Sequence, residues 1–224
     1  MIYNLLILLG GKSSRFSCDI NKVYCLINNK PVFSYSLDKF LKFKEIEKIV
    51  IVYNKDDLEL LNKYLLDYND PRIVLCEGGD ERYDSVINGL KMVSCDKVIV
   101  HDGARPNVSL DAIRDVINAS KDYSCVSLGL KVTDTIKEVK GDNIKTIDRN
   151  SLYSIQTPQI TDYNLLKSCL GQIKKEDGIT DDLMAIEKYS NVTPKIIIGN
   201  KYNYKLTTKE DLQLMEYLLG VQNV

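Results

Sequence analysis

The sequence offers little from which a metal site could be built. Only one of its 224 residues is a histidine, His101, and its six cysteines lie far apart without a C-x-x-C pair. An ordinary structural zinc site takes four Cys or His ligands at short spacings. The sequence therefore excludes that class of site, and we expect no metal site built from protein side chains.

Long apolar runs and an excess of charge of one sign are also missing. No run approaches the ~18 apolar residues of a membrane span, and the first nine residues lack the basic start of a signal peptide. The 30 Lys and Arg residues nearly balance the 31 Asp and Glu residues, which argues against a nucleic acid or a membrane as the main partner. We expect a cytoplasmic protein whose anion sites are local.

The first apolar segment of the chain ends in a glycine-rich loop. Leu5 to Leu9 is an unbroken apolar run, typical of a strand covered on both faces, and Gly10 and Gly11 follow it. Glycines let backbone N–H groups approach a phosphate closely, and Arg15 and Lys22 add fixed positive charge. Because ligands of parallel sheets lie beyond the carboxyl ends of the strands, this loop predicts a polyphosphate site.

Two familiar phosphate-binding loops are excluded by their spacing. In the pattern G-x-x-x-x-G-K-[ST], the first glycine would fall on Leu6, inside the expected strand. The dinucleotide pattern G-x-G-x-x-G fails because Ser13 and Ser14 follow Lys12. A surface loop with incidental charges remains the alternative for this stretch taken alone.

Strands and helices alternate through the first 130 residues. We expect strands at 5–9, 49–53, 73–76, 98–101 and 125–130, and helices at 32–41, 55–66, 84–93 and 110–120. This alternation predicts an α/β fold with a single doubly wound, mostly parallel sheet and no second domain in residues 1–224. The loops 10–22, 78–82 and 102–106 should open on one edge of the sheet and form one site.

The alternation breaks at residue 131. Segment 131–153 alternates with period two on both sides of Gly141-Asp142-Asn143, which predicts a long polar β-hairpin. Its apolar and β-branched residues need burial that a protruding hairpin cannot find alone; they are Val132, Thr133, Ile136, Val139, Ile144 and Ile147. We therefore predict an arm that pairs two subunits into a homodimer. Further helices are expected near 163–170, after Thr180 and from a capping box at 208–211, with a strand at 195–198.

Eight short motifs occur in order along nearly the whole chain. They are G-G-x-x-x-R-x6-K at 10–22, G-G-D-E-R-x-D-S-V-x-N-G-L at 78–90, H-D-G-A-R-P at 101–106, D-T-I-K at 134–137, D-R at 148–149, Q-T-P-Q at 156–159, T-D-D at 180–182 and K-L-T-T-x-E-D-L at 205–212. Together they resemble the 2-C-methyl-D-erythritol 4-phosphate cytidylyltransferases of isoprenoid biosynthesis. The resemblance implies a nucleotidyltransferase fold of GT-A-like type with a β-arm.

The resemblance implies which residues bind the nucleotide. Leu9, Gly10 and Gly11 would contact CTP, and Gly79, Asp80 and Ser85 would frame its cytosine and ribose. Arg15 and Lys22 match the two cations that stabilise the transition state, in which negative charge gathers on the α-phosphate and the departing pyrophosphate. Mg²⁺, bound mainly through the CTP phosphates, is the implied cofactor.

The resemblance also implies an acceptor pocket for a polyol phosphate. Asp102, Gly103 and Arg105 match positions of this pocket, and Thr135 and Thr180 match residues that hold the acceptor. Arg149 and Lys205 match the catalytic residues that aim the acceptor phosphate. Thr135 and Arg149 lie on the arm, so they would act in the partner's site. No nucleophilic side chain is needed, because the acceptor phosphate is itself the nucleophile.

The chain departs from the family pattern at four places. It has Leu9-Gly10 where Ala-Ala is usual, Ser13 where glycine is usual, Asn21 where proline is usual and Gly103 where alanine is usual. Each departure changes backbone freedom and removes no charge. We therefore expect the departures to affect the rate and the tightness of nucleotide binding more than the activity itself.

Three functional hypotheses follow from these motifs. Transfer of CMP to 2-C-methyl-D-erythritol 4-phosphate is favoured, because Asp148-Arg149 and Thr180-Asp181-Asp182 resemble that branch of the family. Ribitol-5-phosphate cytidylyltransferases share most of the pattern and provide the alternative acceptor. A non-catalytic nucleotide-binding protein is the third hypothesis. The joint presence of the four cations that match catalytic residues argues against it; they are Arg15, Lys22, Arg149 and Lys205.

Overall fold

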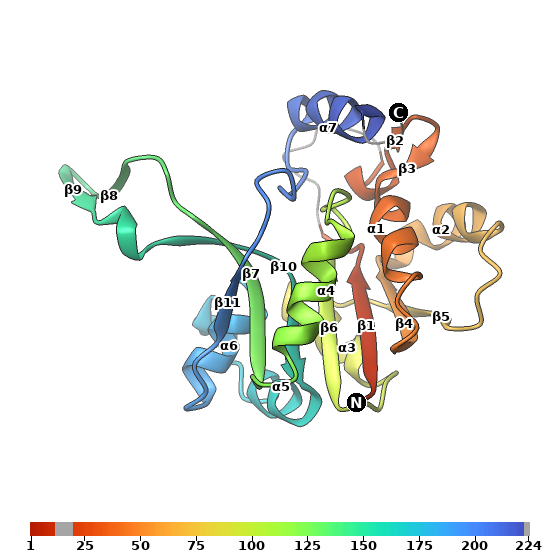
Figure 1. Cartoon of the computed structure of the whole chain (residues 1–224), viewed down its shortest axis with the longest axis horizontal. Coiled ribbons are helices and arrows are strands. Elements are labelled where there is room, and N and C mark those ends of the chain that lie inside the picture. Colours follow the sequence, from red (N-terminus) through yellow and green to blue (C-terminus); the bar gives the residue numbers. More distant parts are fainter. Residues whose placement is uncertain (12–19, 222–224) are drawn as a thin grey trace.

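A computed structural model describes residues 1–11 and 20–221 of the chain. Its body is a seven-stranded sheet in the order β11-β7-β10-β6-β1-β4-β5 (Figure 1). Six of its strands are parallel and lie where the sequence predicted strands. They are β1 (Tyr3–Leu8), β4 (Ile46–Tyr53), β5 (Ile73–Glu77), β6 (Lys97–Asp102), β7 (Cys125–Lys131) and β11 (Lys195–Ile198). The predicted doubly wound, mostly parallel α/β fold is confirmed.

Helices cover both faces of this sheet because the strands are apolar on both sides. Leu5 and Ile7 of β1 pack in one core with α1 (Val32–Phe40), α4 (Leu110–Ala119) and α7 (Lys209–Val221). Leu6 and Leu8 pack in the other core with α3 (Arg82–Leu90), α5 (Tyr163–Leu170) and α6 (Asp182–Tyr189). Alternate residues of a strand point to opposite faces, so one uninterrupted apolar run serves both cores.

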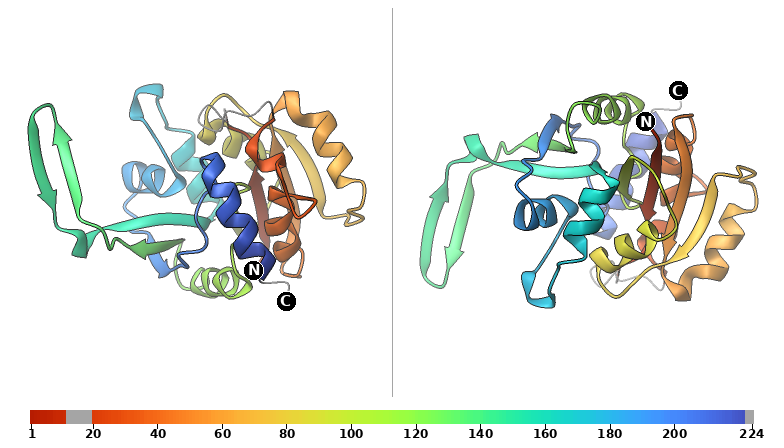
Figure 2. Two further views of the ribbon diagram at one scale, coloured as in Figure 1. Left: turned by 90° about the horizontal axis from the view of Figure 1, so that it is seen from above. Right: turned by 90° about the horizontal axis from the view of Figure 1, so that it is seen from below.

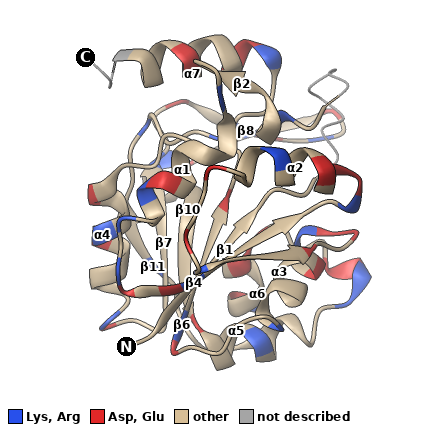
Figure 3. Ribbon diagram, turned by 90° about the vertical axis from the view of Figure 1, so that its right-hand side faces the viewer, with Lys and Arg blue, Asp and Glu red and all other residues tan. Residues whose placement is uncertain are grey.

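Helix boundaries follow local capping. The helix expected from residue 55 begins later, as α2 (Leu58–Leu65), because 55–57 form a 3-10 turn capped by the Asn54 side chain. The N-terminus of α7 is held by Asp211, which accepts hydrogen bonds from the backbone N–H groups of Thr207 and Thr208. Figure 3 shows that most charged residues lie on the helices and loops around the sheet. In the described ranges, no helix is both long and apolar enough to cross a membrane.

One central strand was not expected from the sequence. β10 (Tyr153–Asp162) runs antiparallel between β6 and β7, and its pairing with β7 is interrupted between Ile155 and Gln159. Proline cannot donate a ladder hydrogen bond, and Pro158 lies within this interruption. A proline and several polar residues hide a strand from pattern analysis, although Gln156, Thr157 and Gln159 are all buried.

The predicted hairpin is present as a separate two-stranded sheet. Strands β8 (Ile136–Lys140) and β9 (Asn143–Ile147) pair antiparallel around the two-residue turn Gly141-Asp142, where Gly141 has a φ of 59°. Figures 1 and 2 show this arm extending away from the body. The remaining short strands, β2 (Leu26–Ile27) and β3 (Lys30–Pro31), form a small hairpin before α1.

The arm leaves apolar side chains uncovered. Val139 pairs with Ile144 across the hairpin, and these side chains are 62% and 67% exposed. Ile136 pairs with Ile147 on the opposite face of the hairpin and is partly buried. Each face of the arm therefore carries one apolar pair, and the described residues of the chain leave the pair of Val139 and Ile144 uncovered.

Candidate active site

Three loops that follow parallel strands lie together at one edge of the sheet. They line a central cavity of about 210 Å³. Its walls come from the end of β1, the loop after β5, the start of α3, the end of β6 and the segment before α7. The lining residues are Leu8, Gly10, Gly11, Lys22, Val23, Gly79, Asp80, Glu81, Arg82, Ser85, Asp102, Ala104 and Lys205. The sequence-based expectation that these loops share one site agrees with this arrangement.

The loop after β5 is tightly built around glycine and Ser85. A Cβ on Gly79 would lie 2.3 Å from the Cβ of Asp84, so no larger residue fits there without a shift of the backbone. The N–H of Gly79 donates to Ser85 Oγ at 3.1 Å, and Ser85 Oγ donates to the Glu81 carbonyl at 3.3 Å. These contacts fix the N-terminus of α3 against the cavity, where its positive dipole end favours an anion.

A short 3-10 helix places Lys22 in the cavity wall. Asn21 precedes this helix, which spans Lys22–Tyr24, and its side-chain amide donates to the Leu9 carbonyl at 2.9 Å and to Asp57 at 3.2 Å. Asn21 therefore ties the returning loop to the end of β1. The predicted cation Arg15 lies outside the described residues, and so does Ser13, one of the departures from the family pattern.

A cluster of ionised groups surrounds Asp102 at the end of β6. Lys205 Nζ lies 2.9 Å from Asp102 Oδ2, Arg105 Nε lies 3.6 Å from the same oxygen, and Arg82 Nε lies 3.7 Å from Oδ1. Burial alone would raise the pKa of Asp102, but Lys205, Arg82 and Arg105 together lower it well below its ordinary value. Asp102 is therefore a permanent anion among three cations.

Backbone contacts hold the segment that carries Lys205. The N–H of Leu206 donates to the Ala104 carbonyl at 2.8 Å. Arg105 Nη1 donates to the Asn203 carbonyl at 2.9 Å, and Asn203 Nδ2 donates to the Thr157 carbonyl at 2.9 Å. Three parts of the chain that are distant in sequence are thereby fixed together beneath Lys205.

A second cavity, the side cavity, opens directly beside the first. It has a volume of about 250 Å³ and shares Arg82, Asp102 and Lys205 with the central cavity. Its other lining residues are Arg105, Ile155, Gln156, Thr157, Gln159, Thr180 and Asp181. A third hollow of about 210 Å³ extends the central cavity toward β4, where Tyr53, Asn54 and Lys55 join Gly10, Gly11 and Ser85. The central cavity thus shares lining residues with each of the other two.

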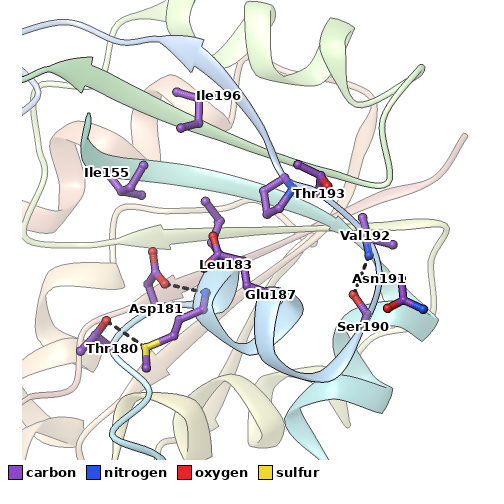
Figure 4. A pocket seen from close by; sticks show the side chains of 12 residues that line it. Ile155, Thr180, Asp181, Leu183, Glu187, Ser190, Asn191, Val192, Thr193 and Ile196 are labelled. Atoms are coloured by element: carbon purple, nitrogen blue, oxygen red, sulfur yellow. Dashed lines mark hydrogen bonds between the residues drawn. The ribbon is translucent and has the colours of Figure 1, made fainter. Parts of the chain in front are cut away.

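A further and larger cavity, of about 750 Å³, adjoins the side cavity on the α6 side (Figure 4). Thr180 and Asp181 line both cavities. Asp181 Oδ1 accepts a hydrogen bond from the Met184 N–H at 2.9 Å and so caps α6, while Gln159 Nε2 donates to Asp181 Oδ2 at 3.1 Å. The boundary between the two cavities is therefore formed by Ile155 of β10 and by the segment that leads into α6.

The structure places the predicted site residues in three groups. Those that line the central or side cavity are Gly10, Gly11, Lys22, Gly79, Asp80, Ser85, Asp102, Arg105, Thr180 and Lys205. Leu9 and Gly103 lie behind the cavity wall, where Leu9 is fully buried and its Cδ2 fills the space beside Gly103. Thr135 and Arg149 lie on the arm, are exposed, and line none of the cavities described above.

The only histidine is buried behind the site. His101 Nδ1 lies 3.1 Å from Thr157 Oγ1, and Nε2 lies 3.1 Å from the Arg105 carbonyl. Burial lowers the pKa of His101 to about 3, so the ring is neutral at physiological pH. His101 therefore supports the loop from Asp102 to Arg105 and has no contact with the cavities.

Arg82 and Asp182 were not singled out from the sequence. Arg82 Nη1 and Nη2 donate to the two carboxylate oxygens of Asp182 at 2.9 and 3.1 Å. Both residues belong to motifs that the sequence shows, but they are 100 residues apart. A sequence motif gives no indication that the two are partners, so only the fold reveals the pair.

Comparison with known proteins identifies the family of the chain. The family model for IspD, 2-C-methyl-D-erythritol 4-phosphate cytidylyltransferase, matches residues 4–221. A relative of that name from Clostridium botulinum (strain Okra / Type B1) is 38% identical, and the match covers 96% of this chain and 96% of the relative. A relative of that name from Clostridioides difficile (strain 630) is 34% identical, and the match covers 99% of this chain and 95% of the relative. The crystal structure of 4-diphosphocytidyl-2C-methyl-D-erythritol synthase from Anaerococcus prevotii superposes with a TM-score of 0.86 at 28% identity, covering 98% of both chains. The chain belongs to the 2-C-methyl-D-erythritol 4-phosphate cytidylyltransferase family and is a nucleotidyltransferase.

Proposed function

We propose that the protein transfers CMP from CTP to the phosphate of 2-C-methyl-D-erythritol 4-phosphate and releases pyrophosphate. One observation carries this proposal beyond the family relationship. The central cavity and the side cavity meet at Asp102 and Lys205. A nucleotide in the central cavity and a polyol phosphate in the side cavity would therefore bring their reacting phosphates to the same lysine.

The reaction needs no nucleophile from the protein. An oxygen of the acceptor phosphate attacks the α-phosphorus of CTP, the bond from that phosphorus to the bridging oxygen breaks, and pyrophosphate leaves with the electron pair. Lys22 stabilises the negative charge that develops on the phosphates, and Arg15 has the same role by family resemblance. Lys205 orients the acceptor phosphate. These cations contribute most when charge builds up in the transition state.

The loop after β5 is proposed to recognise the cytosine base of CTP. The Gly79 N–H donates a hydrogen bond to Ser85 Oγ, Ser85 Oγ donates to the Glu81 carbonyl, and Asp80 lies beside them in the cavity wall. Fixed polar groups favour one base edge, because the wrong base leaves them unpaired. CTP should therefore be used well and ATP poorly.

Mg²⁺ is the proposed cofactor and would enter with the triphosphate. Over the residues that the structure describes, no group of three or more His, Cys, Asp or Glu side chains could hold a metal ion. Asp102 is already paired with Lys205. The phosphate oxygens of CTP would therefore supply most ligands, and the metal would neutralise phosphate charge. The cytoplasmic location expected from the sequence stays a prediction.

The arm is proposed to complete the active site of a second subunit. Arg149 Nη1 donates to the Thr133 carbonyl, which fixes it on the arm, and both Arg149 and Thr135 are exposed. The exposed pair Val139 and Ile144 provides apolar area for a two-fold contact. In a homodimer, Thr135 and Arg149 would reach the acceptor in the partner's side cavity.

A mixing experiment tests the shared site. Chains with Arg149→Ala and chains with Lys22→Ala should each be nearly inactive. A hybrid dimer would place both lesions in one site and leave the other site intact, so mixing should restore up to about half of the normal activity per hybrid. No recovery in verified hybrids, or a monomeric mass for the fully active enzyme, would show that the arm serves its own chain.

Pyrophosphate release with matched substrates tests the proposed reaction itself. With CTP, 2-C-methyl-D-erythritol 4-phosphate should support turnover and ribitol 5-phosphate should not, and replacement of CTP by ATP should abolish most of the rate. Faster turnover with ribitol 5-phosphate would assign the alternative acceptor. Binding of CTP without turnover of either acceptor would identify a non-catalytic nucleotide-binding protein.

A further inference from the structure

Arg82 connects the nucleotide loop to two carboxylates of the acceptor side. It is the first residue of α3, directly after the loop that carries Gly79 and Asp80. Its guanidinium makes a bidentate pair with Asp182 at the start of α6, while its Nε lies 3.7 Å from Asp102. Arg82 also lines both the central and the side cavity. Among the described residues, Arg82 alone pairs with both carboxylates and also lines both cavities.

The pair with Asp182 is strongly desolvated. The Asp182 side chain is 1% exposed and that of Arg82 is 23% exposed. Burial raises the pKa of Asp182, and Arg82 counteracts this shift. The groups that face Asp182 are Arg82 from α3, Asp102 from β6 and its neighbour Asp181. A buried carboxylate that faces two other carboxylates stays ionised only because a cation is in contact with it.

The charges around the side cavity balance only when Arg82 is counted. Three cations, Arg82, Arg105 and Lys205, face three carboxylates, Asp102, Asp181 and Asp182. Without Arg82, two cations would face three carboxylates, and a doubly charged acceptor phosphate would approach a negative wall. Asp102 would also have fewer cations close to it, so its ion pair with Lys205 would be stronger and Lys205 would be less available to the phosphate.

We propose that Arg82 is a positioning residue for the acceptor: it neutralises Asp182 and Asp102 and so keeps Lys205 available to the acceptor phosphate. Arg82 itself makes no required contact with either substrate. The proposal rests on the proposed function, because it concerns how strongly a phosphate acceptor binds beside Lys205. A purely structural ion pair would instead affect folding without changing acceptor binding.

Three variants separate these roles: Arg82→Gln, Asp182→Asn and the double variant. In Arg82→Gln the KM for the acceptor should rise by about ten- to a hundredfold, the range typical of losing a partner behind a ligand-binding group. The affinity for CTP, measured by calorimetry without acceptor, should change much less. The double variant should regain most of the acceptor KM, because the buried charge that Arg82 neutralises has been removed with it.

The pH dependence provides a readout that a structural role would not change. In Arg82→Gln, the unpaired Asp182 takes up a proton more readily, so the acceptor KM should improve relative to that of the wild type as the pH falls from 8 to 6. The double variant should lose this dependence. Arg72→Gln is the matched control, since Arg72 pairs with Asp70 at 2.8 Å and with three backbone carbonyls away from the cavities. It should reduce stability and leave the acceptor KM unchanged.

Two results would overturn the proposal. One is a normal acceptor KM in Arg82→Gln together with a loss of stability like that of Arg72→Gln. The other is a double variant as impaired in acceptor KM as Arg82→Gln. If Arg82→Gln does not fold, Arg82→Lys and the comparison of Asp182→Asn with the double variant apply the same criteria. Failure of the proposed function would look different, because the wild type itself would then release no pyrophosphate with 2-C-methyl-D-erythritol 4-phosphate or would release it faster with ribitol 5-phosphate.

Discussion

Leu9 and Gly103 together provide a quantitative test of how the site is packed. A Cβ on Gly103 would lie 2.3 Å from Leu9 Cδ2 and 3.1 Å from the Leu8 carbonyl oxygen. The first distance is about 1.2 Å short of an ordinary carbon contact of about 3.5 Å. Leu9 is fully buried, so its methyl group cannot move out into solvent. We therefore infer that the two departures from the family pattern are one compensated exchange of volume.

A double-mutant cycle measures this compensation. Gly103→Ala should cost about 1–3 kcal/mol by overpacking, and Leu9→Ala should cost about 2–5 kcal/mol by leaving a cavity. In the double variant the new methyl group occupies part of that cavity. Its loss should be smaller than the sum of the two single losses by about 1–3 kcal/mol.

Urea unfolding followed by circular dichroism gives the three free energies. Gly10→Ala is the control, because its Cβ would meet nothing closer than Ser85 Oγ at 3.9 Å. It should change the free energy of unfolding by less than about 1 kcal/mol. Strict additivity of the Leu9 and Gly103 effects would refute the proposed exchange.

Two further predictions concern ionisable groups. Lys22→Ala should lower kcat by about a hundred- to a thousandfold, with a smaller rise in the KM for CTP. Arg15→Lys should also lower kcat, because an ammonium group cannot span two phosphate oxygens. A near-normal kcat in both variants would contradict the transition-state role of these cations. Burial lowers the pKa of His101 to about 3, so between about pH 6.5 and 3 the unfolded chain binds a proton at this residue that the native chain does not. The contribution of His101 to the free energy of unfolding should therefore fall by up to about 1.4 kcal/mol for each pH unit as the pH decreases through this range. The protein has only this histidine, so its NMR resonance should stay in the neutral position down to pH 5, and a midpoint near 6.5 would show that the ring is accessible.

Local patterns were sufficient to predict most of the fold. Strand β1 follows from an unbroken apolar run, and the capped start of α7 follows from Thr208 and Asp211. The arm follows from alternation around Gly141. In each case the determining residues are neighbours in sequence, so periodicity and capping are enough.

The polar part of the core could not be predicted in this way. β10 carries Gln156, Thr157 and Gln159 into the interior, where they bond to Asn200, His101 and Asp181. Such residues look like a loop until their distant partners are known. The same limit applies to Arg82, whose partner is 100 residues away. Ion pairs and buried polar contacts of this kind depend on tertiary structure, and they make up much of the candidate site.

The most direct test of the proposed reaction follows the oxygen atoms. 2-C-methyl-D-erythritol 4-phosphate labelled with ¹⁸O in its phosphate is incubated with the enzyme, unlabelled CTP and Mg²⁺, and the products are analysed by mass spectrometry and ³¹P NMR. Attack by the acceptor phosphate on the α-phosphorus predicts that all of the label stays in the CDP-alcohol, with one labelled oxygen bridging its two phosphorus atoms, and that the pyrophosphate is unlabelled. Label in the pyrophosphate, or release of pyrophosphate with CMP and no CDP-alcohol, would contradict the proposed transfer.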